Sequence, residues 1–294
     1  GSTTWSVQPV DVIYTNNASA VSSGWRHSCA LLGTGAVQCW GVEPSDVYAV
    51  SNTSKRSSPV VVGGIGNAIA VSAGFNHACA VLSGGTVQCW GDNSLGQLGD
   101  GSTVSSTTPV TVRGISTATS VSTGGLYTCA VLRSGSVQCW GSNGSGQLGD
   151  GSKTKSTIPV MVSGISTATS VSAVDFTTCA VLRSGDLKCW GSNLSGKLGN
   201  GSTTNSSTPV PVSGITNAIA VAAGSSSTCA VLNSGQVQCW GSNSSGRLGD
   251  GSTTESSTPV LVSSISTATS VSVGDRQTCA LLSSGVVQCW GSNY

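Results

Sequence analysis

Residues 129–141 of the chain read Cys129-Ala-Val-Leu-Arg-Ser-Gly-Ser-Val-Gln-Cys-Trp-Gly141. Two short apolar runs, each containing a cysteine, flank the three residues Arg-Ser-Gly at 133–135. A three-residue loop ending in glycine is typical of a β-hairpin, because the last loop residue needs a positive φ. The stretch therefore predicts two antiparallel strands in which Cys129 and Cys139 lie directly opposite each other.

The same hairpin recurs every 50 residues along the whole chain of 294 residues. The six units cover residues 1–50, 51–100, 101–150, 151–200, 201–250 and 251–294. Each unit carries four short strand patterns and no helical periodicity, which predicts an all-β fold. A four-stranded unit of this length repeated six times is typical of a β-propeller, which protects its sheet edges by radial repetition. We expect one six-bladed propeller domain over residues 1–294.

The positions of the strand patterns also predict how the blades are assembled. If the Ala-Val-Ser strand is innermost and the Pro-Val strand outermost, each blade takes its outer strand from the following unit. Residues 9–12, which open the chain's first Pro-Val pattern, would then complete the blade formed by residues 267–290. We therefore expect four strands in every blade and an N-terminal strand that closes the ring.

The twelve cysteines form six pairs with the same spacing as Cys129 and Cys139. Directly opposed residues at a non-hydrogen-bonded pair have Cα atoms about 4.5 Å apart, which a disulfide accepts. Buried free thiols are the alternative, and the spacing and the scarcity of histidine disfavour zinc. The predicted disulfides, one per blade, are Cys29–Cys39, Cys79–Cys89, Cys129–Cys139, Cys179–Cys189, Cys229–Cys239 and Cys279–Cys289.

Composition bounds the function. The formal net charge is +1 and only 8% of the residues are charged, so no basic surface for nucleic acid is expected. No run approaches the roughly 18 apolar residues of a membrane span. Twelve cysteines with two histidines favour an oxidising compartment, so the protein is expected to be secreted or exposed at a cell surface.

The loop between the first and second strand of each unit differs between otherwise similar copies. Three positions vary, and they read Trp25-Arg26-His27, Phe75-Asn76-His77, Gly125-Leu126-Tyr127, Asp175-Phe176-Thr177, Ser225-Ser226-Ser227 and Asp275-Arg276-Gln277. They gather aromatic residues and arginines, which are enriched at protein interfaces. The predicted binding residues are Trp25, Arg26, His27, Phe75, Asn76, His77, Leu126, Tyr127, Asp175, Phe176, Asp275 and Arg276. Drift in exposed loops is the alternative explanation.

Catalytic and metal sites are weakly indicated. His27 and His77 occupy equivalent positions in neighbouring units, but no patterned carboxylate accompanies them, so they are interpreted as surface histidines. No nucleophile motif or phosphate loop occurs, and we expect no enzyme activity, metal or cofactor. Seven Asn-x-Ser/Thr sequons, several of them on long loops, could carry glycans: Asn17, Asn52, Asn143, Asn193, Asn200, Asn205 and Asn243.

Three motifs resemble the regulator of chromosome condensation repeat: Ala70-Val-Ser-Ala-Gly-Phe-Asn-His77, Val87-Gln-Cys-Trp-Gly91 and Gly96-Gln-Leu-Gly-Asp100. The resemblance covers the whole chain and implies a β-propeller, a fold that usually has seven blades in that family. The paired cysteines are not a hallmark of the family, and residues 42–48 lack the Gly-Gln-Leu-Gly loop. The repeats are also similar to those of a bacterial β-lactamase-inhibitor propeller, which implies that aromatic residues in the inner loops grip a partner protein.

These observations lead to one functional hypothesis and one alternative. The first is an extracellular, non-catalytic module that binds a protein or glycan through its inner loops. The alternative is a structural or adhesive module of a cell-surface protein or filament that assembles through its own faces or rim.

Overall fold

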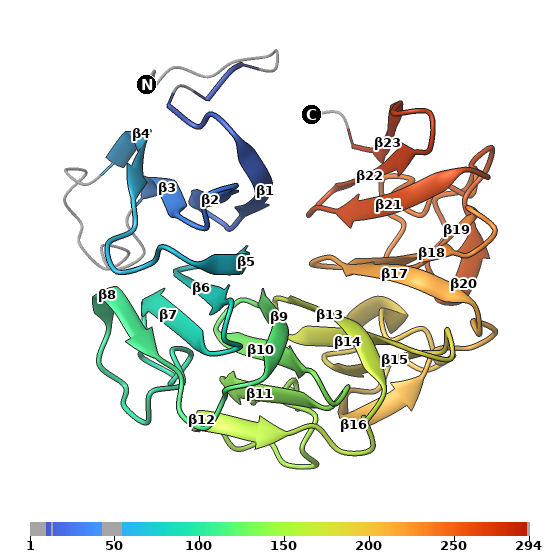
Figure 1. Ribbon diagram of the computed structural model, residues 1–294. Helices are drawn as coiled ribbons and strands as arrows, with labels where there is room; N and C mark the ends of the chain where they lie inside the picture. Colours follow the sequence, from blue (N-terminus) through green and yellow to red (C-terminus); the bar gives the residue numbers. More distant parts are fainter. Residues whose placement is uncertain (1–9, 13, 43–54, 293–294) are drawn as a thin grey trace. The chain divides into compact units, whose positions relative to one another are not determined.

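The computed structural model describes residues 10–12, 14–42 and 55–292, and its fold is an all-β, six-bladed propeller (Figure 1). The described chain falls into two compact units. Unit 1 comprises residues 1–133, 140–142 and 155–160, and unit 2 comprises residues 134–139, 143–154 and 161–294. Within the described residues, no helix is long and apolar enough to cross a membrane.

Each blade is an antiparallel sheet whose strands follow one another in chain order. The first strands are β1 (Ala18–Ser23), β5 (Ala68–Ala73), β9 (Ala118–Thr123), β13 (Ala168–Val174), β17 (Ala218–Ala223) and β21 (Ala268–Val273). The second strands are β2 (His27–Leu32), β6 (His77–Leu82), β10 (Tyr127–Leu132), β14 (Thr177–Leu182), β18 (Ser227–Leu232) and β22 (Gln277–Leu282).

The third strands are β3 (Val37–Val42), β7 (Val87–Gly91), β11 (Val137–Gly141), β15 (Leu187–Gly191), β19 (Val237–Gly241) and β23 (Val287–Gly291). The fourth strands are β4 (Lys55–Val61), β8 (Ser106–Thr111), β12 (Ser156–Met161), β16 (Ser206–Pro211) and β20 (Ser256–Leu261). A short 3-10 turn, η1 (Leu194–Gly196), lies in one long loop. As predicted, each fourth strand comes from the following sequence unit.

The expected fourth strand of the last blade is not formed by the described residues. The sheet β21-β22-β23 has three strands, residues 10–12 carry no strand, and Pro9 lies outside the described residues. Val10 and Val12 are 71% and 43% exposed, whereas Val112 and Val162, at the positions equivalent to Val12, are 1% and 3% exposed. Residues 10–12 therefore bury too little apolar surface to offset the entropy of ordering a strand.

The predicted hairpin register is confirmed. Cys79 pairs with Cys89 across β6 and β7, and the Gly85 amide donates to the Leu82 carbonyl at 2.8 Å. Gly85 has a φ of 86°, which explains why every unit ends this turn with glycine. The six predicted disulfides are present, one per blade. The Cα–Cα distance is 4.0–4.1 Å in the blades that contain Cys29, Cys79, Cys179, Cys229 and Cys279.

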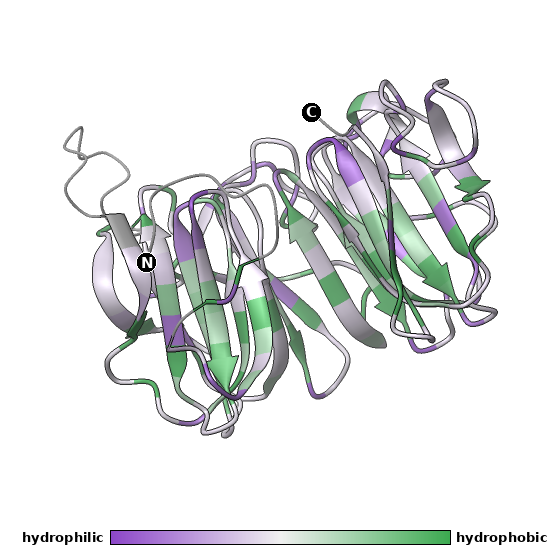
Figure 2. Cartoon of the chain, turned by 90° about the horizontal axis from the view of Figure 1, so that it is seen from above, coloured by the Kyte–Doolittle hydropathy of each residue, from purple (hydrophilic) through white to green (hydrophobic). Residues whose placement is uncertain are grey.

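Apolar and polar residues alternate along many of the strands (Figure 2), and each core lies where neighbouring blades pack together. In unit 1 a cluster joins Cys79, Leu98, Val112 and Trp140, all of them buried. Equivalent clusters in unit 2 contain Leu198 with Trp240 and Leu248 with Val262. Small alanines and valines from the inner strands complete these cores, so the second strands β6, β10, β14 and β18 are buried on both faces, whereas β22 of the last blade is partly exposed.

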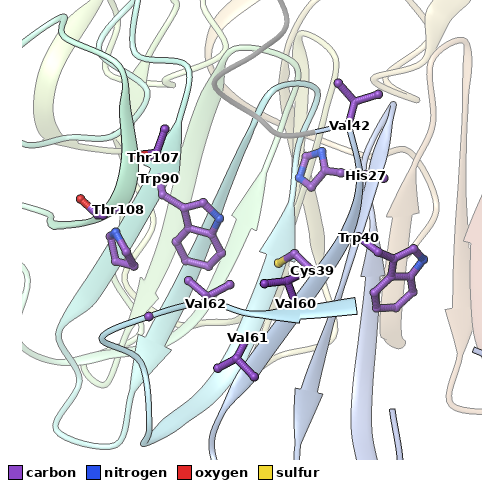
Figure 3. A pocket seen from close by; sticks show the side chains of 13 residues that line it. His27, Cys39, Trp40, Val42, Val60, Val61, Val62, Trp90, Thr107 and Thr108 are labelled. Carbon is purple, nitrogen blue, oxygen red and sulfur yellow. The ribbon is translucent and has the colours of Figure 1, made fainter. Parts of the chain in front are cut away.

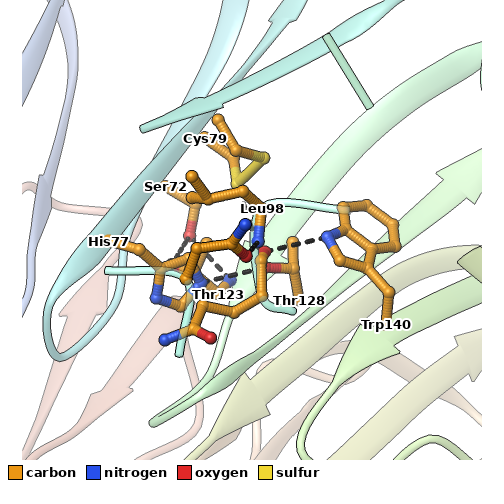
Figure 4. The surroundings of a disulfide bond; sticks show 10 residues. Ser72, His77, Cys79, Leu98, Thr123, Thr128 and Trp140 are labelled. Atoms are coloured by element: carbon orange, nitrogen blue, oxygen red, sulfur yellow. Dashed lines mark hydrogen bonds between the residues drawn. A yellow bond between two sulfur atoms is a disulfide. The ribbon is translucent and has the colours of Figure 1, made fainter. Parts of the chain in front are cut away.

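The long loop of one blade is fastened to the tryptophan of the next. In unit 1 the Gln97 carbonyl accepts hydrogen bonds from Trp140 Nε1 at 2.9 Å and from Thr128 Oγ1 at 3.0 Å (Figure 4). In unit 2 the carbonyls of Gln147, Lys197 and Arg247 each accept the equivalent pair. The Gly-x-Leu-Gly and Trp-Gly motifs are therefore two halves of one contact between blades.

Candidate functional site

The inner loops connect the first and second strands of the blades, and the backbone holds them tightly. The Gly24, Gly74 and Gly124 amides each donate a hydrogen bond of 2.8 Å to the backbone carbonyl of the residue three positions later. The middle residue of the loop is fixed by the start of the long loop, because the Asp92 amide donates to the Asn76 carbonyl at 2.8 Å. Inner and long loops therefore share one end of the blade, while the side chains at the first two loop positions are left to vary.

The third variable position is structural in five of the six loops. His27, His77, Tyr127, Thr177 and Ser227 are at most 4% exposed, because this position opens the second strand. A Cβ on Gly74 would lie 2.8 Å from His77 Cε1, so the loop glycine makes room for this side chain. The interpretation of His27 and His77 as surface histidines is wrong, and Tyr127 and His77 offer no surface to a partner.

Burial controls the protonation of the two histidines. It lowers the pKa of His27 to about 4 and, together with the charge of His27, lowers the pKa of His77 to about 3. His77 Nε2 lies 2.9 Å from Thr128 Oγ1, whose own proton goes to the Gln97 carbonyl. Nε2 must then carry the proton in that hydrogen bond. Both histidines are neutral at pH 7, and His77 is inaccessible to a substrate.

Unit 1 presents an aromatic cluster on its inner loops, in which Trp25 is exposed and Phe75 is half-buried. Trp25 is 60% exposed, and its ring centroid lies 5.8 Å from that of Phe75 with an interplanar angle of 36°. The guanidinium carbon of the exposed Arg26 lies 4.3 Å from the centroid of the Trp25 ring. Tilted aromatic pairs and cation–π contacts of this kind are attractive. The two loops are thereby joined into one apolar surface with a charged edge.

The remaining predicted residues of unit 1 contribute less surface. Leu126 is half-buried, and Asn76 is 8% exposed. The buried Oδ1 of Asn76 has no hydrogen-bond partner among the described residues. The exposed side chains of the predicted site in unit 1 are therefore Trp25 and Arg26, while Phe75 and Leu126 are half-buried.

The inner loops of unit 2 are polar and carry charge. Phe176 is 40% exposed and Asp175 is half-buried. Arg276 Nε lies 3.7 Å from Asp275 Oδ2, with both side chains at least 70% exposed. An exposed pair of this kind contributes little to stability, so both groups remain available to a partner.

Two buried cations of unit 2, absent from the sequence prediction, support these loops. Lys197 is 2% exposed and Arg247 is 7% exposed. Lys197 Nζ donates to the Ser225 carbonyl at 3.0 Å, while Arg247 donates to the Asp275 carbonyl at 2.8 Å and to the Ser226 hydroxyl. Burial lowers the pKa of Lys197, and Asp175 opposes that shift. The sequence signal for these two residues is the aligned position in other units, where Gln97 and Gln147 replace the charged Lys197 and Arg247.

The described residues do not gather a set of metal ligands. They contain no group of three or more His, Cys, Asp or Glu side chains placed to hold a metal ion. The acidic residues of the long loops are used by turns: Asp100 Oδ1 accepts from the Ser102 amide at 2.9 Å and from Asn93 Nδ2 at 3.2 Å.

Three of the seven sequons are buried. Asn143, Asn193 and Asn243 are at most 1% exposed, and their Nδ2 groups donate into the long loops. A glycan on Nδ2 would break these hydrogen bonds, so the expectation that the long loops tolerate glycans is wrong at these three positions. Asn17 and Asn205 are exposed, Asn200 is half-buried, and Asn52 lies outside the described residues.

Comparison with known proteins identifies the repeat and the fold. Two family models, both described as the regulator of chromosome condensation (RCC1) repeat, match the chain. One matches residues 18–43, 68–97, 118–147, 168–197 and 218–247, and the other matches residues 84–131, 134–181, 184–231 and 234–281. No curated protein sequence matches the chain.

Several solved structures share the fold at low identity. Human WBSCR16 is 21% identical with a TM-score of 0.82, over 94% of this chain and 76% of that one. Yeast RCC1 (Prp20), solved with Kap60 bound, is 19% identical with a TM-score of 0.79, over 92% and 69%. The ectodomain of the Arabidopsis thaliana receptor kinase ACR4 is 18% identical with a TM-score of 0.56, over 94% and 80%. At these identities the likeness concerns the fold alone.

Proposed function

Because the chain belongs to the regulator of chromosome condensation repeat family, we propose that it is an extracellular, non-catalytic module whose inner loops bind a protein or a glycan. The observation that carries the proposal is the cluster of Trp25, Phe75 and Arg26 in unit 1. Tryptophan and arginine are enriched among the residues that dominate the binding energy of protein interfaces, and contiguous exposed apolar surface often marks an interaction site. The inner loops of unit 2 form a second contact region in this proposal.

A binding role is consistent with what is known of similar folds. The yeast relative Prp20 was crystallised with Kap60 bound, and its binding to Gsp1p and histones has been described. These partners belong to that protein, and the disulfide-bearing repeats of this chain point to a different compartment. Six disulfides form and persist in oxidising surroundings, which supports an extracellular location.

A catalytic role fits the geometry poorly. The Thr128 hydroxyl contacts His77, but it donates its proton to the Gln97 carbonyl, and both side chains are fully buried. A general base has to reach the proton it removes from a bound substrate. We therefore assign the inner loops to recognition and His77 to packing.

The test is affinity capture from the protein's native surroundings, together with a glycan array, with the disulfide-bonded chain immobilised. The test variant combines Trp25→Ala with Phe75→Ala, and the control is Val104→Ala, whose side chain is 73% exposed elsewhere in unit 1. Losing a central aromatic pair should weaken capture at least tenfold while the control captures normally. Capture by the double variant at the wild-type level, with an unchanged melting temperature, would remove the inner loops of unit 1 from the proposal.

A further inference from the structure

A cavity of about 340 Å³ lies in unit 1 between the first and second blades. Its walls are largely apolar and include Val60, Val62, Trp90 and Pro109. The His27 imidazole lines the cavity and is turned toward Trp90 (Figure 3). A mostly apolar pocket of this size with a few placed polar groups is typical of small-molecule sites.

His27 has an unused hydrogen-bonding atom at this wall. The residue is 4% exposed, and its Nε2 has no hydrogen-bond partner among the described residues. The cause is local to this blade pair: His77 bonds to the Thr128 hydroxyl, whereas the position equivalent to Thr128 beside His27 is Ala78. A buried polar atom without a partner is unfavourable, and a ligand that pairs with it would recover that loss.

The neighbouring pair of blades indicates what chemistry such a space accepts. There the Leu98 side chain packs in one cluster with Val112 and Trp140, and the carbonyl of Gln97 accepts from Trp140 Nε1 and Thr128 Oγ1. Val62 and Trp90 are the equivalents of Val112 and Trp140, and both line the cavity. The Gly-Gln-Leu-Gly sequence that supplies the carbonyl and the leucine is absent from residues 42–48.

We propose that this cavity binds a small neutral molecule that combines a branched aliphatic group with a carbonyl oxygen. The aliphatic group packs against Val62 and Trp90 as Leu98 packs against their counterparts, and the carbonyl oxygen accepts a hydrogen bond from His27 Nε2. The ligand is neutral because the imidazole is neutral at pH 7, and a charged ligand would lose its hydration without gaining an opposite charge. The cavity lining does not include Trp25, Arg26 or Phe75, so the site is separate from that cluster.

The probe is N-acetyl-leucine N-methylamide, which carries the isobutyl group and a carbonyl, and the control probe is N-acetyl-glycine N-methylamide. Binding to the disulfide-bonded chain is followed by NMR at the Trp90 indole and the His27 imidazole. A ligand of this size is expected to bind with a Kd on the order of 1 mM. The leucine probe should give saturable shifts at both side chains, and the glycine probe should give none.

The decisive variant is Ala78→Thr, which gives His27 the hydroxyl partner that His77 already has. Threonine occupies this position in four other units, so the fold should be kept. The matched control is Ala20→Thr, at an exposed position of β1. The proposal requires at least tenfold weaker binding in Ala78→Thr and unchanged binding in Ala20→Thr. It is overturned if the wild type shows no saturable shift, if Ala78→Thr binds equally well, or if residues 43–54 are found in the cavity.

Discussion

Acid should destabilise this protein well above the pH at which its carboxylates titrate, because two histidines are buried in the neutral form. The pKa of His27 is lowered to about 4 and that of His77 to about 3, from an ordinary value of 6.5. Between 6.5 and these values the unfolded chain binds more protons than the folded chain. The free energy of unfolding is therefore highest above pH 6.5, and it falls as the pH decreases toward the pKa values that the histidines have in the folded protein.

The magnitude follows from these pKa values. Between pH 8 and pH 5 each histidine should lower the free energy of unfolding by about 2 kcal/mol, or about 4 kcal/mol for the pair. The pKa values of Asp100 and Asp250 are lowered from 3.8, largely through hydrogen bonds from serine and asparagine that outweigh their burial. Their contribution is present above pH 3.8 and lost only below it, so it does not affect this interval.

The assay is urea denaturation at pH 8, 6.5 and 5 with the disulfides intact. The test variant is His27→Tyr with His77→Tyr, since Tyr127 occupies the equivalent buried position of the third blade. The wild type should lose about 4 kcal/mol between pH 8 and pH 5, and the variant should lose little. A wild-type loss below about 1 kcal/mol, or an equal loss in the variant, would refute the assignment of buried neutral histidines.

Three further predictions concern the repeat. Gly74→Ala should destabilise the protein by about 1–3 kcal/mol in thermal denaturation, because the new Cβ would lie 2.6 Å from the Gly124 carbonyl oxygen. The control is Gly66→Ala, because no atom lies within 4 Å of a Cβ at Gly66. Trp190→Phe should lower the free energy of unfolding in urea by about 1–3 kcal/mol, because it leaves the buried Gln147 carbonyl with one hydrogen-bond donor fewer. An unchanged free energy of unfolding would mean that the contact between blades does not depend on this hydrogen bond. The intact mass under non-reducing conditions should lie about 12 Da below that of the reduced chain. The double variant Cys179→Ala with Cys189→Ala should have a free energy of unfolding lower by roughly 2–3 kcal/mol. Full thiol reactivity of the native chain would contradict the cysteine pairing.

The blade could be predicted from the sequence because its determinants are local and repeated. The spacing of Cys129 and Cys139 around a glycine-terminated turn fixes the hairpin register, and the period of 50 residues fixes the number of blades. The pairing of residues 9–12 with the last blade was a long-range expectation. It depends on contacts that no local pattern encodes, and residues 10–12 form no strand.

The inner loops were found correctly as the variable segments, but exposure within them could not be predicted. Whether His27 lies on the surface depends on where β2 begins, and a shift of one residue exchanges a solvent position for a core position. Lys197 was missed for a different reason. A lysine in a polar loop normally extends into solvent, and its burial is set by the Ser225 carbonyl of the next blade.

Hydrogen–deuterium exchange of the captured complex shows which backbone amides a bound partner protects, and it therefore tests whether the inner loops of unit 1 bind that partner. We expect new protection at the backbone amides of residues 24–27 and 74–76 when the partner is bound, with the hairpin turns at 33–35 and 83–85 unchanged. Protection confined to those turns or to the outer strands β4 and β8, with the inner loops exchanging as in the free protein, would contradict it.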